Sequence, residues 1–171
     1  MSVKIISDDL LVIDDDIVTI DMEHIENVKN MAMSSKKRRA RICLHKSDKD
    51  KVHEMIIAVC YNSYIRPHKH NAKMESFHLI EGEANILIFE SNGSIKQNIK
   101  LGFGDNIVYR IDKDFYHTIV PTTPILVIHE VTNGPFIQDN SEYAEFSPEE
   151  GSYRVKEYKN MLRNINIKKD L

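Results

Sequence analysis

The sequence predicts an all-β sandwich or barrel with helices confined to its two ends. Many short apolar or alternating segments are separated by turn residues, which is the pattern of an all-β fold. Helical spacing of apolar residues occurs only near the two ends of the chain. With 171 residues, the chain is long enough for one domain with a sizeable core.

Residues 3–20 alternate between apolar pairs and acidic clusters. Leu10–Ile13 and Ile17–Ile20 flank the acidic triplet Asp14-Asp15-Asp16, which predicts two short strands joined by an acidic turn. Because edge strands recruit partners, these strands could pair across a homodimer. Asp21 then follows as the expected cap of a helix that runs to about Met33, with apolar residues on one face.

The middle of the chain predicts a series of strands. A period-two segment, Ala40 to His45, would direct Arg39, Arg41, Cys43 and His45 to one face. Ser91-Asn92-Gly93 favours a tight hairpin turn between two such segments. Further strands are expected at residues 53–61, 64–70, 76–80, 83–90, 94–101, 106–111, 117–120 and 125–131.

A second helix is expected at the C-terminal end. Ser147-Pro148-Glu149-Glu150 combines a Ser cap, Pro at the first helical position and Glu three residues after the cap. Val155, Tyr158, Leu162 and Ile165 continue as an apolar stripe. The helix should therefore cover one edge of the β structure.

Composition excludes several classes of partner. The net charge is −3, so the total charge does not favour nucleic acid or anionic membranes. The longest apolar run, residues 55–61, is too short to span a bilayer, and acids interrupt the N-terminus where a signal peptide needs apolar residues. Two cysteines make no disulfide framework. We therefore expect a cytoplasmic protein.

The chemistry is concentrated in Arg66-Pro67-His68-Lys69-His70, followed by Glu75 and Gly82. Residues i and i+2 of a strand share a face, so two imidazoles at this spacing can converge on one cation. A short polar hairpin loop, residues 71–74, would return Glu75 to face them. Two imidazoles and a carboxylate are a common ligand set for a divalent transition metal, and Gly82 would mark the next turn.

This motif resembles the first conserved motif of the cupin superfamily. The resemblance implies a cupin double-stranded β-helix (jelly-roll barrel) with a metal in its mouth and, here, an N-terminal and a C-terminal helix. On this basis we expect N-terminal strands and a helix at 1–35, the barrel at 36–137 and an extension with a helix at 138–171, as one domain overall.

The flanking residues resemble one branch, the WbuC-type cupin metalloproteins found among bacterial surface-polysaccharide (O-antigen) genes. These stretches cover most of residues 22 to 163. They are Arg38-Arg39-Ala40-Arg41 with His45, Tyr64 through His70, Glu75-Ser76-Phe77, Tyr116-His117-Thr118, and Glu130 through Gly134-Pro135-Phe136.

The resemblance implies a fourth ligand, His117, but its motif departs from the usual cupin pattern. Asp112 and Asp114 stand where Pro and the second Gly are usual, and Pro121 replaces Asn. Asp114 could still make the turn, because Asp tolerates a left-handed conformation. The expected cofactor is one divalent transition metal (Fe, Mn, Ni or Zn), whose identity the ligand types do not fix.

Several other residues are candidates for substrate contact. Arg41, His45, Tyr64, Arg66 and Phe77 lie near the site strands, where the arginines either hold a phosphate or carboxylate or form a solvated basic face. Glu130 is either a salt-bridge acid or a base that reaches into the barrel, and Tyr116 is expected to wall the pocket. His78 alternates out of phase with Glu75 and should face away.

Three functions remain open at this point. An open metal site polarises a bound oxygen, so that a sugar or sugar-nucleotide could isomerise or epimerise while Glu130 or a Tyr, with Tyr116 as the catalytic candidate, moves the proton. An iron-dependent dioxygenase would use the same ligands. A non-catalytic barrel would bind a sugar or its phosphate and regulate. The O-antigen context favours a sugar or sugar-phosphate as the small-molecule substrate, but it comes from the resemblance alone.

Overall fold

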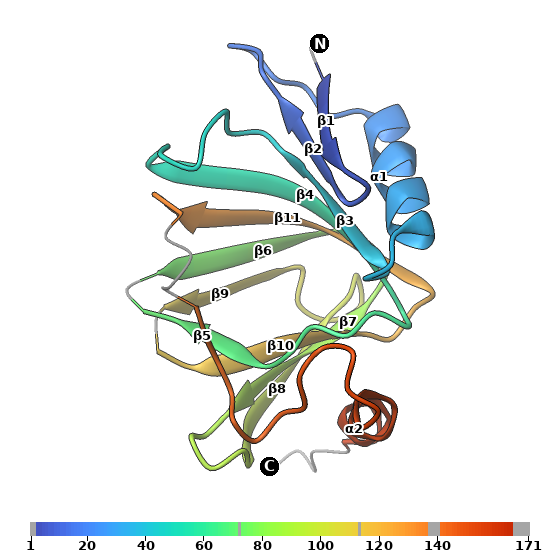
Figure 1. The fold of residues 1–171 in the computed structure, drawn as a ribbon, viewed down its shortest axis with the longest axis vertical. Coiled ribbons are helices and arrows are strands. Elements are labelled where there is room, and N and C mark those ends of the chain that lie inside the picture. Colours follow the sequence, from blue (N-terminus) through green and yellow to red (C-terminus); the bar gives the residue numbers. More distant parts are fainter. Residues whose placement is uncertain (1–2, 72, 113, 137–140, 166–171) are drawn as a thin grey trace.

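A computed structural model describes residues 3–71, 73–112, 114–136 and 141–165. Most of the regular secondary structure is strand, with one helix near each end (Figure 1). In chain order the elements are β1 (Val3–Ser7), β2 (Leu10–Ile13), α1 (Met22–Ser34), β3 (Arg39–Cys43), β4 (Val52–Cys60), β5 (His68–His70), β6 (Met74–Glu81), β7 (Ala84–Phe89), β8 (Ile95–Leu101), β9 (Val108–Asp112), β10 (Tyr116–Pro121), β11 (Ile125–Asn133), β12 (Ser141–Tyr143) and α2 (Val155–Arg163).

The strands form two sheets that face each other. The first has seven strands in the order β1-β2-β3-β4-β11-β6-β9, and the second has five in the order β12-β5-β10-β7-β8. Nearly all the pairs are antiparallel; β2 and β3 are parallel. This two-sheet arrangement with a helix near each end confirms the predicted all-β class (Figure 1).

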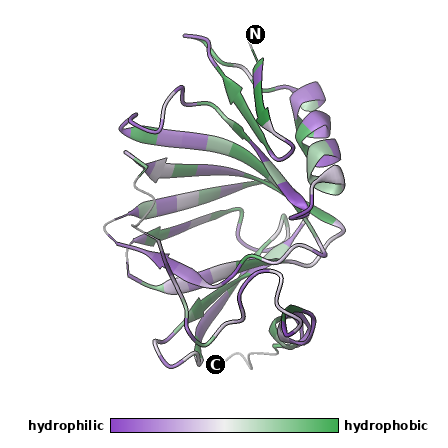
Figure 2. Ribbon diagram, viewed as in Figure 1, coloured by the Kyte–Doolittle hydropathy of each residue, from purple (hydrophilic) through white to green (hydrophobic). Residues whose placement is uncertain are grey.

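The core has one part between the two sheets and one on the outer face of each sheet. Side chains such as Phe77, Ile86 and Ile128 fill the space between the sheets. Helix α1 buries Ile25, Val28 and Ala32 against the outer face of the seven-stranded sheet. Hydrophilic residues gather at the left-hand ends of β4, β5 and β6 in Figure 2, the side of the sandwich that carries the His motif. The apolar core thus leaves one end of the sandwich polar.

Helix α1 begins where the sequence predicted. Asp21 caps it, because the Asp21 side chain accepts a hydrogen bond of 3.1 Å from the backbone N–H of His24. We expect Asp21→Ala to lower the free energy of unfolding by about 1 kcal/mol. Asp21→Asn keeps an acceptor and should retain most of that stability in urea denaturation. Equal losses for the two variants would show that the cap contributes nothing.

The predicted second N-terminal strand is wrong. Residues 17–20 form no strand; instead β1, which the sequence did not predict, pairs with β2. The opposite edge of β2 pairs with β3. A third strand therefore has no free edge of β2 to pair with. Val18 and Ile20 pack against the core cluster beneath α1, which accounts for their apolar character.

The predicted hairpin between the His-x-His strand and Glu75 is also wrong. Strand β5 belongs to the five-stranded sheet, where it pairs with β10 and β12, whereas β6 belongs to the seven-stranded sheet between β11 and β9. The connection therefore crosses from one sheet to the other. Glu75 faces the histidines across the interior of the sandwich and not along a shared strand pair.

The C-terminal helix starts later than predicted. Helix α2 begins at Val155, and the preceding residues 149–154 form turns. Ser147 is not a helix cap, because its hydroxyl is buried and donates to the carbonyl of Ala144. The apolar stripe behaves as expected: Leu162 and Tyr158 pack against Leu87 and Phe89 on the outer face of the five-stranded sheet. Within the described residues, no helix is long and apolar enough to cross a membrane.

Candidate metal centre

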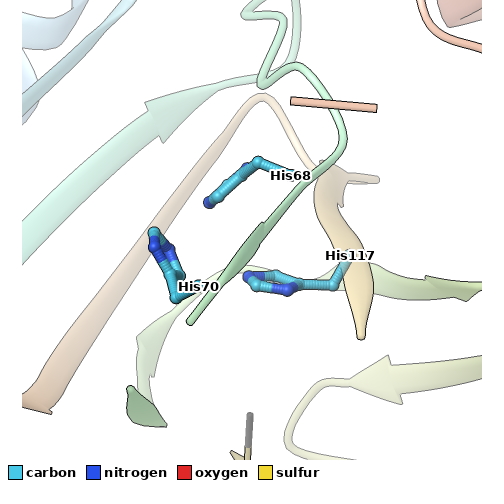
Figure 3. A group of neighbouring side chains, drawn as sticks. All are labelled: His68, His70 and His117. Carbon is cyan, nitrogen blue, oxygen red and sulfur yellow. The ribbon is translucent and has the colours of Figure 1, made fainter. Parts of the chain in front are cut away.

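Three imidazoles meet at the polar end of the sandwich. His68 and His70 come from β5, and His117 comes from the neighbouring strand β10, where it pairs directly with His68. One nitrogen from each ring lies within 4.8 Å of the corresponding nitrogens of the other two (Figure 3). The three rings point toward a common centre, so this cluster could hold a metal ion.

The outer nitrogen of each ring has its own partner. The Nδ1 of His68 donates to the carbonyl of Arg66 at 2.8 Å, and the Nδ1 of His117 donates to the carbonyl of Phe115 at 3.0 Å. The Nδ1 of His70 lies 2.9 Å from the hydroxyl of Ser141. Such partners fix the ring orientation and leave Nε2 for the centre, as in histidines that bind metals.

Glu75 completes the group from the opposite sheet. Its two carboxylate oxygens lie 3.1 Å from the Nε2 of His70 and 3.0 Å from the Nε2 of His117. The carboxyl group is buried, which opposes its ionisation, but hydrogen bonds from the two imidazoles hold its pKa well below the ordinary value. Glu75 therefore brings a negative charge to the centre.

The protonation pattern tests whether these residues fit a metal. Burial disfavours the charged ring of His117, but the hydrogen bond to Glu75 and the negative charge of that carboxylate raise the pKa of this imidazole. With Nδ1 donating to Phe115, the proton on Nε2 lies between the ring and the carboxylate of Glu75, in the position that a metal ion would take from it. Burial and the neighbouring imidazoles lower the pKa of His68 to about 3, so its ring stays neutral, the form that coordinates metals. The donor set fits a divalent transition metal.

The turn before β10 explains how an atypical motif still delivers His117. Asp114 has a φ of 65°, the left-handed conformation that a glycine usually supplies. The sequence predicted this role for Asp114, and the structure confirms it. Because His117 then points inward, its neighbour Tyr116 points to the other side of the sheet.

A cavity of about 800 Å³ opens over the histidines. Its lining includes five of the predicted site residues outside the metal group, namely Arg41, His45, Arg66, Phe77 and Glu130. Arg66 is held in place by the carbonyl of Ala144 and the hydroxyl of Ser147. His45 stacks on His53 with ring centroids 4.0 Å apart. A cavity of this size suits a small organic ligand.

Two predicted tyrosines do not belong to the cavity. The hydroxyl of Tyr64 is buried and donates to the carbonyl of Pro148, so this side chain anchors the C-terminal segment. The hydroxyl of Tyr116 bonds the carboxylate of Glu142, and its ring packs against Phe146 on the outer side of the five-stranded sheet. The structure thus corrects both the substrate-binding role of Tyr64 and the catalytic role of Tyr116. His78 faces outward as predicted and contacts His129.

Glu130 lies on the cavity wall beside the metal group. It pairs with Phe77 across β11 and β6, two residue pairs along the sheet from Thr132 and Glu75. Burial, and to a lesser degree the negative charge of Glu75, raises the pKa of Glu130 to about 8. A carboxyl group that gains and loses its proton near neutral pH is suited to proton transfer.

This raised pKa gives a test on protein dialysed against EDTA. Relative to Glu130→Gln, the wild type should lose stability as the pH rises from 4.5 to about 8. Over that range the folded carboxyl group keeps its proton while the unfolded chain releases it. Urea denaturation at pH 5 and pH 8 measures the difference. If the difference in the free energy of unfolding between the two proteins is the same at pH 5 and pH 8, the raised pKa of Glu130 is contradicted.

The sequence did not reveal Ser141 or the strand that carries it. Strand β12 pairs with β5 on the side away from β10, which places Ser141 beside His70. The two residues are 71 positions apart, and a three-residue strand has no periodicity to detect. Only the pairing of strands in three dimensions identifies Ser141 as a support for the centre.

Comparisons with known proteins agree with this fold. A family model described as a domain of unknown function (DUF6016) matches residues 20–101. No curated protein matches the sequence significantly. Protein SO0799 of Shewanella oneidensis has a similar structure, with a TM-score of 0.52 at 11% identity over 60% of this chain and 72% of that one.

The capsular polysaccharide assembling protein CapF of Staphylococcus aureus is also similar, with a TM-score of 0.56 at 18% identity. The match covers 66% of this chain but only 33% of CapF. At these identities the likeness concerns the fold alone. The fold is cupin-like, as the His-x-His motif led us to expect.

Proposed function

We propose that this protein is a metal-dependent cupin of the WbuC type that isomerises or epimerises a sugar or sugar-nucleotide for a surface polysaccharide such as O-antigen. The observation that carries the proposal is the convergence of His68, His70, His117 and Glu75 at the base of a cavity. In structural metal sites, protein ligands usually fill every coordination position, whereas these ligands face a space large enough for a small molecule.

The site residues have two proposed roles, metal binding and proton transfer. Bound to the three imidazoles and Glu75, a divalent metal would act as a Lewis acid toward a substrate oxygen. Glu130 is the group that would take the proton from a carbon next to that oxygen and return it, since it lies on the cavity wall and its pKa is about 8. Phe77, paired with Glu130, would restrict water on that side.

The polysaccharide context is supported from two directions. The flanking motifs resemble WbuC-type cupins, and CapF, which shares the fold, is by name a capsular polysaccharide assembling protein. We further propose that the protein works in the cytoplasm as a homodimer. Strand β1 supports the dimer, because it is the edge of the seven-stranded sheet and its side chains Ile5 and Ile6 are exposed.

Deuterium exchange tests the proposed chemistry. Metal-loaded protein is incubated in D₂O with a panel of nucleotide-sugars, and the sugar carbons are followed by NMR. Proton removal and return should place deuterium on one carbon, and Glu130→Gln should abolish the exchange while it keeps the metal. Substrate-dependent consumption of O₂ would favour the iron-dependent dioxygenase instead. Binding without exchange or oxygen consumption would favour a regulatory sugar-binding or phosphate-binding cupin.

A further inference from the structure

Tyr109 places a hydroxyl group in the apolar core between the two sheets. The residue is only 6% exposed, and it packs in the cluster that contains Phe77, Ile86 and Ile128. Among the residues that the structure describes, the hydroxyl group finds no hydrogen-bond partner. A buried polar group without a partner costs free energy, and a phenylalanine would fill the same space without that cost. The hydroxyl of Tyr109 therefore calls for an explanation.

The strand register places Tyr109 beside Glu75. Tyr109 on β9 pairs with Phe77 on β6, and the next inward-facing pair along these strands is Ile111 with Glu75. Glu75 is thus a diagonal neighbour of Tyr109 on the interior face. Diagonal neighbours on antiparallel strands lie about 7–8 Å apart, within reach of aromatic and long side chains.

Packing and charge prepare the Tyr109 hydroxyl to act as a donor. The ring of Tyr109 lies parallel to that of Phe77, with centroids 5.7 Å apart, so that stacking fixes the plane of the ring. Burial raises the pKa of Tyr109, and the negative charge of Glu75 raises it further, in agreement with the proximity that the register indicates. The hydroxyl therefore keeps its proton and can donate it to an acceptor.

The carboxylate of Glu75 is the acceptor that metal binding would make available. Its oxygens lie 3.1 Å from the Nε2 of His70 and 3.0 Å from the Nε2 of His117. Metal ligation requires a lone pair on each of these nitrogens, so an imidazole that ligates through Nε2 can no longer donate to Glu75. The carboxylate then loses two donors, while Tyr109 beside it has a donor without an acceptor.

We propose that Tyr109 is a positioning residue for the metal ligand Glu75: when the imidazoles no longer donate to the carboxylate, the Tyr109 hydroxyl donates to it in their place. This inference deepens the proposed function and rests on its metal centre. Tyr109 is not among the residues that line the cavity, so it acts through Glu75 and not on the substrate. Hydrogen bonds of this kind orient metal ligands, and their loss lowers metal affinity by about 10- to 100-fold.

Tyr109→Phe tests the proposal, because it removes the hydroxyl and keeps the ring. We expect the affinity for Zn²⁺ or Mn²⁺, measured by competition with a chelator, to fall about tenfold or more. In protein dialysed against EDTA, the urea midpoint of the variant should equal or exceed that of the wild type, because a hydroxyl without a partner does not stabilise the fold. A merely structural hydroxyl would give the opposite pattern, a lower midpoint and an unchanged metal affinity.

Tyr64→Phe is the matched control. The hydroxyl of Tyr64 is also buried, but it donates to the carbonyl of Pro148 at 2.8 Å. Its removal should lower the urea midpoint, since the carbonyl loses its donor. The affinity for Zn²⁺ or Mn²⁺ should stay within about twofold of the wild type. The two Tyr→Phe variants are thus expected to differ in both measurements.

A double-mutant cycle shows whether Tyr109 acts through Glu75. In a Glu75→Ala background, Tyr109→Phe should change the metal affinity by less than about twofold. A loss of about tenfold in that background would overturn the positioning role. The same conclusion would follow if Tyr109→Phe bound metal like the wild type, or if its EDTA-treated form were less stable than the wild type.

The outcomes separate this proposal from the proposed function. A wild type that binds no metal would overturn both. Metal binding that does not depend on the Tyr109 hydroxyl would overturn only the positioning role. Metal binding that weakens in Tyr109→Phe, in a protein that exchanges no deuterium into any nucleotide-sugar, would support the positioning role and contradict only the isomerase or epimerase activity.

Discussion

Replacing His117 with alanine is expected to lower the affinity for a divalent transition metal by more than about 100-fold. Loss of a residue that only supports a metal ligand already costs about 10- to 100-fold, and His117 is proposed as a ligand. Its Nε2 lies 3.0 Å from Glu75, and its Nδ1 is fixed by the carbonyl of Phe115, so the ring is oriented toward the centre. Equilibrium dialysis with Zn²⁺ or Mn²⁺ measures the change.

His78→Ala is the matched control. His78 lies on β6, three residues after Glu75, but points to the outer face of the sheet, where it contacts His129. Its loss should leave metal affinity within about twofold of the wild type. Comparable losses for the two variants would show that surface histidines hold the metal. Unchanged affinity in His117→Ala would remove this residue from the centre.

Gly82→Ala is expected to lower the free energy of unfolding by about 2 to 5 kcal/mol. Gly82 has a φ of 84°, a conformation that costs a residue with a Cβ about 1–2 kcal/mol. A Cβ built there lies only 2.3 Å from the carbonyl oxygen of Ile125 and 2.7 Å from the hydroxyl of Thr123. Overpacking against backbone adds about 1–3 kcal/mol. Urea denaturation of both proteins measures the loss.

Gly151→Ala separates the two contributions. Gly151 has nearly the same φ, 86°, but nothing lies within 4 Å of a Cβ built there. Gly151→Ala should therefore lower the free energy of unfolding only by the cost of the backbone conformation, about 1–2 kcal/mol. If both variants lose the same amount, the close approach of the Ile125 carbonyl to Gly82 has no energetic consequence. The turn glycine of the motif would then be explained by φ alone.

The sequence predicted the components of the site better than their assembly. The His-x-His spacing, Glu75 and the turn at Asp114 are local features, and each lies where its spacing indicated. Alternation also placed Arg41, Glu130 and Phe77 on the cavity wall. These inferences hold because the face of a strand depends only on residue parity.

The sequence did not show which strands pair when they are far apart along the chain. A short polar loop after His70 is compatible with either a hairpin or a crossing between sheets, and the partner of β5 decides which one forms. Ser147 has the residues of a helix cap, but its hydroxyl is satisfied by Ala144 and the helix starts later. Tyr116 was assigned to the pocket by family resemblance, although its position next to His117 directs it outward.

The central claim is that four side chains from two sheets bind one metal ion. Elemental analysis of protein purified without a His tag, before and after incubation with Fe²⁺, Mn²⁺, Ni²⁺ or Zn²⁺, tests it most directly. We expect about one ion per chain that survives gel filtration and is lost when His68 and His70 are both replaced by alanine. No retained transition metal after incubation, or the same metal content in the double variant, would contradict the account.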